Sequence, residues 1–132
     1  MACILVIDDD RSIFHAIEVT LDPPHYVIWA EDVPQARQVI RDVRPDLIIL
    51  DYFLRETATI PTFLAELRHA LPSTPILILT AVDSVHVATE AFRSGADDFL
   101  GKPFDAEVLQ QRVAALLSAK RPAPPASPTS PG

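Results

Sequence analysis

LIILD, residues 47–51, consists of four branched apolar residues followed by an aspartate. A continuous apolar run of this length, with no polar residue inside it, is typical of a strand that is buried on both faces of a parallel sheet. Similar runs recur along the chain. They predict strands at residues 4–7, 26–29, 47–50, 76–79 and 99–100.

Segments of helical length separate these runs. They span roughly residues 11–21, 33–43, 60–71, 84–94 and 105–119. In the last segment, Leu109, Val113 and Leu116 follow the spacing of three to four residues that marks an amphipathic helix. Strands that alternate with helices in this way predict an α/β domain with a doubly wound parallel sheet and right-handed crossovers.

The chain has 132 residues, which suits one domain of ordinary size. Its last part, residues 120–132, is rich in Pro, Ser and Ala. Such a composition cannot bury a core and predicts a disordered tail, which is either a natural end or a linker to an output domain. We therefore expect the folded domain to span residues 1–119.

The formal net charge is −7, and the Lys and Arg residues are scattered. This argues against nucleic-acid binding by this chain, because affinity for the phosphate backbone comes mainly from clustered Lys and Arg. No apolar run approaches the roughly 20 residues needed to cross a bilayer, so we expect no membrane partner. The single cysteine, Cys3, excludes an intramolecular disulfide and suits a reducing compartment, which predicts a cytoplasmic location.

Polar residues follow most of the predicted strands. Three aspartates at 8–10 follow the first strand, Asp51 the third, Thr80 the fourth and Lys102 the fifth. The carboxyl ends of parallel strands meet at one edge of the sheet, where open α/β proteins bind their ligands. We therefore expect carboxylates, a hydroxyl and an ammonium group to lie close together there.

This set of groups suits phosphoryl transfer to a carboxylate, with Asp51 as the nucleophile. Carboxylates this close repel one another, and a divalent cation relieves the repulsion. For Mg²⁺ we expect Asp9 and Asp51 as direct ligands and Asp8 as a ligand through water. Lys102 would offset charge on the phosphoryl group. Thr80 would hydrogen-bond a phosphoryl oxygen after transfer and so sense the modified state.

Each residue also has an ordinary structural explanation. An aspartate after a strand often caps the next helix, and we expect this of Asp10. Asp51 can be a loop residue, Thr80 a hydroxyl at a strand end, and Lys102 a solvated charge. The functional interpretation is favoured because four strand ends carry, in order, the groups that one reaction needs.

Four motifs carry a resemblance to a known family: Ile-Asp-Asp at 7–9, Leu-Asp at 50–51, Leu-Thr-Ala at 79–81 and Gly-Lys-Pro-Phe at 101–104. As an ordered set they resemble the receiver domains of response regulators in two-component signalling. The similarity covers residues 3 to about 119. It implies a flavodoxin-like, three-layer α/β/α fold, with five parallel strands in the order 2-1-3-4-5 and five helices.

The resemblance also implies roles for single residues. Asp51 would accept a phosphoryl group from the phosphohistidine of a sensor histidine kinase or a histidine phosphotransfer protein. Asp8 and Asp9 match the acidic pair of the Mg²⁺ site, Lys102 matches the lysine of the family, and Thr80 matches its switch hydroxyl.

Three further features rest on the same resemblance. Phe99 matches the aromatic residue that rotates inward when the switch hydroxyl moves, although plain core packing is an equally ordinary role for it. The backbone carbonyl of Phe53 is expected to bind the metal. The Lys102–Pro103 peptide is usually cis in this family.

The sequence departs from the family after the phosphate-accepting position. Residues 52–59 contain no glycine, where the family usually carries a Pro-Gly turn and a later Asp-Gly. The positions two beyond Asp51 and two beyond Thr80 are the apolar Phe53 and Val82. We expect both to restrict the attacking water and to give a long-lived phosphoryl state.

The function predicted from these features is a phosphorylation-dependent switch that catalyses only its own phosphorylation and dephosphorylation. Its partner surface would be the exposed side of residues 84–119, which would contact an output domain, a separate effector or another copy of the chain. Two alternatives stay open. One is a receiver-like interaction module that works without phosphate, and the other is an Mg²⁺-dependent phosphatase with an aspartate nucleophile.

Overall fold

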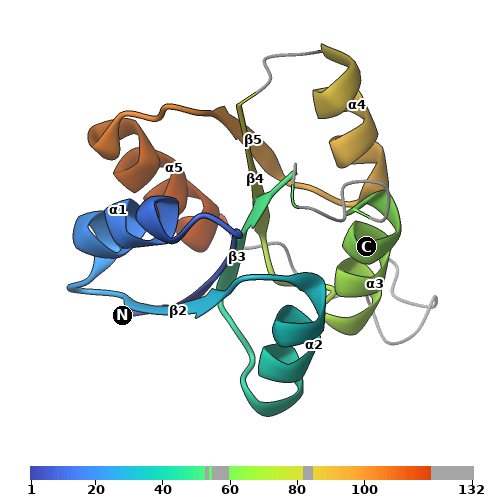
Figure 1. Ribbon diagram of the computed structural model, residues 1–132, viewed down its shortest axis with the longest axis horizontal. Coiled ribbons are helices and arrows are strands. Elements are labelled where there is room, and N and C mark those ends of the chain that lie inside the picture. The colour runs from blue at the N-terminus through green and yellow to red at the C-terminus, as the bar shows by residue number, and fades with distance from the viewer. Residues whose placement is uncertain (53, 55–59, 82–84, 120–132) are drawn as a thin grey trace, which may run out of the picture.

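The computed structural model describes residues 1–52, 54, 60–81 and 85–119. Its centre is a five-stranded parallel sheet in the order β2-β1-β3-β4-β5 (Figure 1). This order and the parallel pairing confirm the predicted fold class. The strands are β1 (Cys3–Ile7), β2 (Tyr26–Ala30), β3 (Leu47–Asp51), β4 (Ile76–Thr80) and β5 (Asp98–Gly101).

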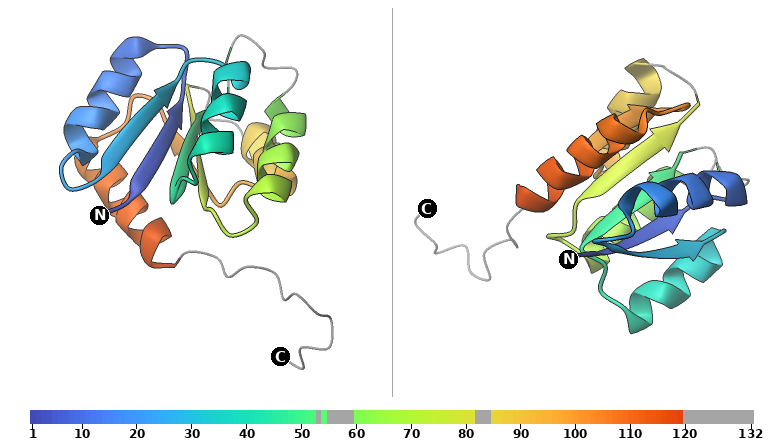
Figure 2. Two further views of the ribbon diagram at one scale, coloured as in Figure 1. Left: turned by 90° about the horizontal axis from the view of Figure 1, so that it is seen from below. Right: turned by 90° about the vertical axis from the view of Figure 1, so that its left-hand side faces the viewer.

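Helices cover both faces of the sheet. They are α1 (Arg11–Leu21), α2 (Val33–Asp42), α3 (Ile60–Ala70), α4 (Val85–Ser94) and α5 (Ala106–Ser118). Helices α1 and α5 lie on one face, and α2, α3 and α4 lie on the other, as Figures 1 and 2 show. The observed bounds lie within one or two residues of those expected for every element that the sequence predicted. The three-layer architecture is therefore also confirmed.

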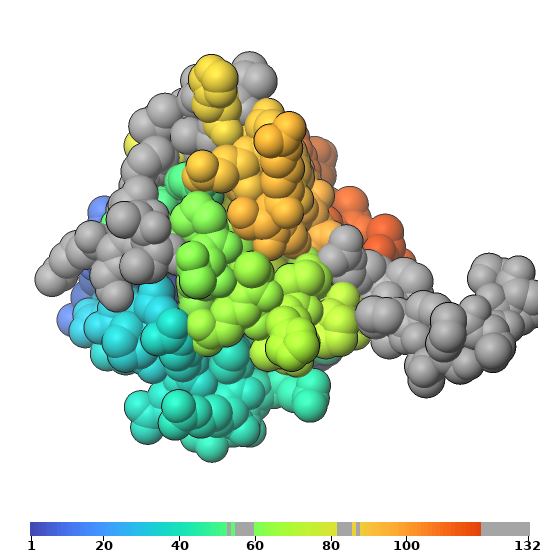
Figure 3. All heavy atoms as spheres, turned by 90° about the vertical axis from the view of Figure 1, so that its right-hand side faces the viewer, coloured from blue at the N-terminus to red at the C-terminus, as the bar shows by residue number. Residues whose placement is uncertain are grey.

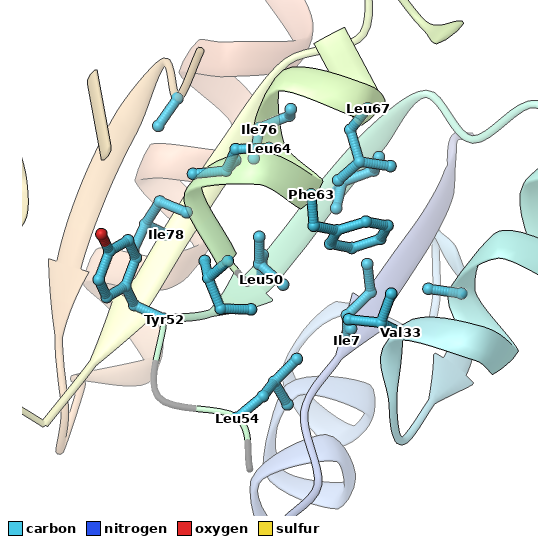
Figure 4. Close-up of a cluster of buried hydrophobic side chains, with 14 of the residues drawn as sticks. Ile7, Val33, Leu50, Tyr52, Leu54, Phe63, Leu64, Leu67, Ile76 and Ile78 are labelled. Atoms are coloured by element: carbon cyan, nitrogen blue, oxygen red, sulfur yellow. The ribbon is translucent and has the colours of Figure 1, made fainter. Parts of the chain in front are cut away.

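The continuous apolar runs are explained by burial on both sides of the sheet. In β3, Ile48 and Leu50 face the cluster beneath α2 and α3, whereas Leu47 and Ile49 face the cluster beneath α1 and α5. The first cluster is centred on Phe63 of α3, which is almost fully buried (Figure 4). Each such side chain contributes roughly 1.5–3 kcal/mol through the hydrophobic effect. The sheet is therefore a rigid platform for the residues at its edge.

Local signals fix the helix ends. Asp10 caps α1 by accepting hydrogen bonds from the Ser12 backbone N–H (2.9 Å) and hydroxyl (2.6 Å), which confirms its expected role. These bonds hold the pKa of Asp10 below its usual value. Gly95 ends α4 with φ +125°, a conformation that L side chains rarely adopt.

Two ion pairs lie at the start of β5, at the edge of the sheet where the strands begin. Asp97 accepts a hydrogen bond from the Arg68 guanidinium at 2.6 Å, and Asp98 accepts one from Arg112 at 2.9 Å. Arg68 also donates to the carbonyls of Gly95 and Thr74, so it ties α3 to the loops before β4 and β5. None of the helices in the described ranges is both long and apolar enough to cross a membrane.

Candidate functional site

The strand ends converge as the topology requires. Asp51 is the last residue of β3 and pairs with Leu79 of β4, one residue before Thr80. Thr80 in turn pairs with Gly101 of β5, the residue before Lys102. The same register places Ile7 beside Leu50, so the aspartates after β1 lie next to Asp51. The parallel pairing thus brings the polar residues from four strands to one edge.

Three carboxylates form a cluster at this edge. Each of Asp8, Asp9 and Asp51 offers one oxygen atom, and these atoms all lie within 4.8 Å of one another. Asp8 and Asp51 are only 1% and 5% exposed, so their mutual repulsion is weakly screened by water. Closely spaced carboxylate oxygens are the donors that a hard divalent cation such as Mg²⁺ prefers. The chemistry of the donor set therefore fits Mg²⁺.

Both the carboxylate and the backbone of Asp8 are hydrogen-bonded. One carboxylate oxygen accepts a hydrogen bond from the Asp10 backbone N–H, and the other accepts one from Lys102 Nζ, both at 2.8 Å. Its own N–H donates to the Ala30 carbonyl at 3.1 Å, and its carbonyl accepts from Trp29 Nε1 at 2.7 Å. Both carboxylate oxygens of Asp8 are thus already engaged, which favours a contact to metal through water.

Lys102 links two of the three carboxylates. Its Nζ lies 2.8 Å from Asp8 Oδ2 and 3.6 Å from Asp51 Oδ1. Its backbone N–H donates to the Thr80 carbonyl at 2.7 Å, which fixes the residue relative to β4. The Lys102–Pro103 peptide is cis, as the resemblance implied. Within the described residues, Lys102 Nζ lies near two of the three carboxylates, and Asp9 adds a third negative charge to the cluster. This excess of negative charge favours the binding of a further cation.

Thr80 and Phe99 lie on neighbouring strands. Thr80 is fully buried, and Phe99 is partly buried against the cluster beneath α2 and α3. Phe99 pairs with Ile78, which precedes Thr80 by two residues, so Phe99 lies farther from the edge that carries the carboxylates than Thr80 does. Both residues therefore lie on adjacent strands, near the edge that carries the carboxylates.

Tyr52 is a candidate that the sequence analysis missed. It directly follows Asp51, its side chain is buried in the core cluster, and its N–H donates to the Leu79 carbonyl at 2.9 Å. Its hydroxyl, which lies at the edge of the cluster in Figure 4, is hydrogen-bonded to the Glu90 carboxylate of α4. Its sequence signal is a polar aromatic residue directly after Asp51.

Trp29 stacks on Phe14 of α1, with ring centroids 5.3 Å apart and an interplanar angle of 12°. The indole N–H reaches the Asp8 carbonyl, so the only tryptophan of the chain contacts the backbone of the acidic cluster. Two other residues expected near the site, Phe53 and Val82, lie outside the described residues.

Comparison with known sequences identifies relatives. The family model for the response regulator receiver domain matches residues 4–114. The response regulator MprA of Mycobacterium sp. strain KMS is 37% identical over 129 residues, which are 97% of this chain and 55% of that protein. MprA of Mycobacterium avium is 37% identical over 120 residues, or 90% of this chain and 52% of that protein. This chain therefore spans about half the length of these curated relatives.

Solved structures give the same result. A response regulator from Thermotoga maritima has a TM-score of 0.83 at 26% identity, and the match covers 89% of this chain and 98% of that one. NtrX from Brucella abortus has a TM-score of 0.82 at 31% identity, covering 89% of this chain and 27% of that one. A Burkholderia pseudomallei response regulator with a phosphorylated aspartic acid, a calcium ion and citrate has a TM-score of 0.79 at 25% identity. That match covers 89% of this chain and 69% of the other.

Proposed function

Because this chain belongs to the response-regulator receiver-domain family of two-component systems, we propose that it is switched by phosphorylation of Asp51. Response regulators are signalling proteins rather than enzymes that turn over an external substrate. The observation that carries the proposal is the position of Asp51. Its carboxylate belongs to the cluster with Asp8 and Asp9, and it lies 3.6 Å from Lys102 Nζ.

The reaction would be an in-line displacement at phosphorus. One carboxylate oxygen of Asp51 attacks the phosphoryl group of a phosphohistidine on a sensor histidine kinase or a histidine phosphotransfer protein. The phosphorus–nitrogen bond breaks, and its electron pair stays on the imidazole nitrogen, which then takes a proton from solvent. Hydrolysis of the acyl phosphate by water releases inorganic phosphate and restores the Asp51 carboxylate. The protein thus catalyses only its own modification and its reversal.

Asp9 and Asp51 are the proposed direct ligands of Mg²⁺, with Asp8 acting through water and the Phe53 carbonyl as a further ligand outside the described residues. When bound, Mg²⁺ supplies positive charge that offsets the carboxylates and the transferred oxygens. A solved relative contains both a phosphorylated aspartic acid and a calcium ion, and this supports the proposal that the chain binds a divalent cation.

Lys102 would act as a second cation on the phosphoryl group. In the present arrangement its Nζ is closer to Asp8 (2.8 Å) than to Asp51 (3.6 Å). A phosphoryl group on Asp51 brings additional negative charge within reach of the same ammonium, which strengthens that contact electrostatically. Lys102 therefore stabilises the charge on the modified residue without accepting or donating a proton.

The signal would pass through Thr80 and Phe99. The buried Thr80 hydroxyl would hydrogen-bond a phosphoryl oxygen, and Phe99 would move into the space that this opens. The resulting population shift would change the exposed side of residues 84–119, which would contact an output domain, an effector or a second copy of the chain. We place this signalling in the cytoplasm. Residues 1–119 would form the receiver domain and residues 120–132 a linker or tail.

The direct test is phosphorylation by acetyl phosphate in the presence of Mg²⁺, followed by intact mass. We expect one phosphoryl group to be gained by the wild type and none by Asp51→Asn or by a sample with the metal removed. No gain in a folded sample that also fails to bind beryllofluoride would contradict the proposal. That result would favour the phosphate-independent interaction module, an alternative suggested by the glycine-free stretch at 52–59.

A further inference from the structure

A groove lies between α2 and α3 on the face of the sheet opposite α1 and α5. Its volume is about 310 Å³. The charged residues that line this α2–α3 groove are Arg37, Arg41, Arg44 and Glu66, and the apolar ones are Ile40, Ala70 and Leu71. The two helices lie next to each other in Figure 3, which shows this side of the molecule.

The groove is locally basic although the protein is acidic. The chain carries a net charge of −7 and only 11 Lys and Arg residues, yet three arginines line this one groove. A single carboxylate, Glu66, stands against them, so positive charge is in excess. Asp42, the last residue of α2, is not part of the lining. The net charge of the lining residues is therefore opposite in sign to that of the whole chain.

One of the three arginines is engaged in an ion pair, and the other two are available to bind a ligand. Arg37 forms a two-pronged ion pair with Glu66, at 2.8 and 2.9 Å, and its guanidinium lies 5.7 Å from the centre of the Phe63 ring. The hydrogen bond from Arg37 lowers the pKa of Glu66, which favours the charged carboxylate in this pair. Arg41 and Arg44 are exposed and form no ion pair or hydrogen bond within the part of the chain that the structure describes.

The rest of the lining is apolar. Ala70 is exposed, Ile40 is partly buried against the core cluster, and Leu71 is almost fully buried. A free anion such as phosphate would use the guanidinium groups but leave these apolar surfaces uncovered. A peptide that combines carboxylates with apolar side chains would satisfy both parts of the lining, because each kind of surface then meets its complement.

The groove is also remote from the acidic site. Arg44 lies just before β3, and Leu71 lies between α3 and β4. Both therefore lie near the edge where the strands start, whereas Asp51 and Thr80 close the same two strands at the other edge. A partner bound there leaves the acidic cluster and α4 uncovered.

We propose that the α2–α3 groove binds an acidic, partly apolar peptide segment of a partner protein, independently of the state of Asp51. The segment places carboxylates on Arg41 and Arg44 and an apolar side chain against Ala70 and Ile40. The arginines would supply both attraction and orientation, since a guanidinium can hold a carboxylate through two parallel hydrogen bonds. Association would weaken with increasing salt.

The test uses the full chain and a fluorescein-labelled peptide of sequence Glu-Leu-Glu-Glu-Leu-Glu. We expect saturable binding, with backbone amide shifts in NMR spectra concentrated in the second halves of α2 and α3. Arg41→Glu combined with Arg44→Glu should weaken binding by at least about fivefold. Lys120→Glu combined with Arg121→Glu makes the same change in net charge at residues that are not among the lining of the groove. This matched control should bind as the wild type does.

Other outcomes would overturn the proposal. These are equal binding by the double variant and the wild type, equal binding of a peptide with Lys in place of Glu, shifts centred on another surface, or no binding at millimolar peptide. Binding of ATP in the groove without binding of the peptide would assign it to a nucleotide instead. Beryllofluoride should leave peptide affinity unchanged, so loss of phosphorylation at Asp51 would not by itself affect this result.

Discussion

The Tyr52 hydroxyl donates a hydrogen bond to the Glu90 carboxylate, so the residue directly after Asp51 is connected to helix α4. The Tyr52 ring is buried in the core cluster that also contains Ala91, the next residue of α4. This places a polar contact between the strand that carries the proposed nucleophile and the start of the proposed partner surface. This hydrogen bond therefore connects the end of β3 to α4.

Tyr52→Phe should make activation easier. The substitution keeps the ring in the core and removes only the hydrogen bond that restrains α4 in the unmodified arrangement. Since a hydrogen bond to a charged group is worth about 1 kcal/mol or more, the apparent affinity for beryllofluoride should rise by about fivefold. Glu90→Gln keeps an acceptor oxygen and is the matched control, with affinity near that of the wild type. Unchanged affinity in Tyr52→Phe would show that the bond is equally strong in both states.

Asp9→Asn should stabilise the metal-free protein while weakening its affinity for Mg²⁺. The change removes one of three charges whose oxygens lie within 4.8 Å. Relief of this repulsion, partly screened by solvent, should add about 1 kcal/mol to the free energy of unfolding, or about 4 °C in Tm. Mg²⁺ affinity should fall by about tenfold because a direct ligand loses its charge.

Both effects can be measured on the same samples. Thermal unfolding in EDTA gives the stability, and a titration with Mg²⁺ followed by fluorescence of Trp29, the only tryptophan, gives the affinity. Asp42→Asn, which neutralises an exposed carboxylate on α2, controls for the change in net charge. If Asp9→Asn and Asp42→Asn had the same Mg²⁺ affinity, Asp9 would not be a ligand.

The N-cap of α1 should make stability depend on pH. The pKa of Asp10 is lower in the folded protein than its usual value of 3.8, chiefly because of the hydrogen bond from the Ser12 hydroxyl. A carboxyl with a lowered folded pKa stabilises the fold above its unfolded pKa, and this contribution is lost as the pH falls through the folded pKa. Asp10→Ala should therefore be less stable than the wild type at neutral pH, and the difference should shrink below about pH 4.

Asp10→Asn separates the charge from the cap. Asparagine also accepts the Ser12 N–H bond but does not titrate in this range. Its Tm should therefore stay closer to that of the wild type at neutral pH. The difference in Tm between Asp10→Asn and Asp10→Ala should be independent of pH from neutral to acid conditions. A difference that changes with pH would mean that other groups dominate the titration.

The strands, and the residues at their ends, can be predicted from local sequence patterns. Residues 47–50 are predicted as a buried strand because their apolar side chains are continuous, and alternate side chains of β3 do enter two different clusters. The positions of Asp51 and Lys102 followed because parallel strands end at one edge. The strand order came only from the family resemblance, since apolar runs do not say which strands are neighbours.

Contacts between distant segments were not predictable. Tyr52 and Glu90 are 38 residues apart, and the Trp29 indole reaches an Asp8 carbonyl 21 residues earlier. Sequence spacing carries no signal for either pair, because each depends on how a helix or a neighbouring strand is placed in three dimensions. The basic α2–α3 groove was missed for the same reason. Arg37, Arg41 and Arg44 are spaced by four and three residues, as on one helix face, but the groove also needs α3, whose position beside α2 the spacing does not give.

Phe53→Asn should shorten the life of the phosphorylated protein. Phe53 lies outside the described residues, so this prediction rests on its place two residues beyond Asp51. An apolar side chain there would exclude the water that attacks phosphorus, whereas an amide can hold and orient that water.

The first-order loss of label from ³²P-phosphorylated protein should therefore be faster in Phe53→Asn, by about threefold or more. Phe53→Leu keeps an apolar side chain and should decay as slowly as the wild type. Rapid decay in the wild type, unchanged in Phe53→Asn, would show that position 53 does not control access of water to the acyl phosphate.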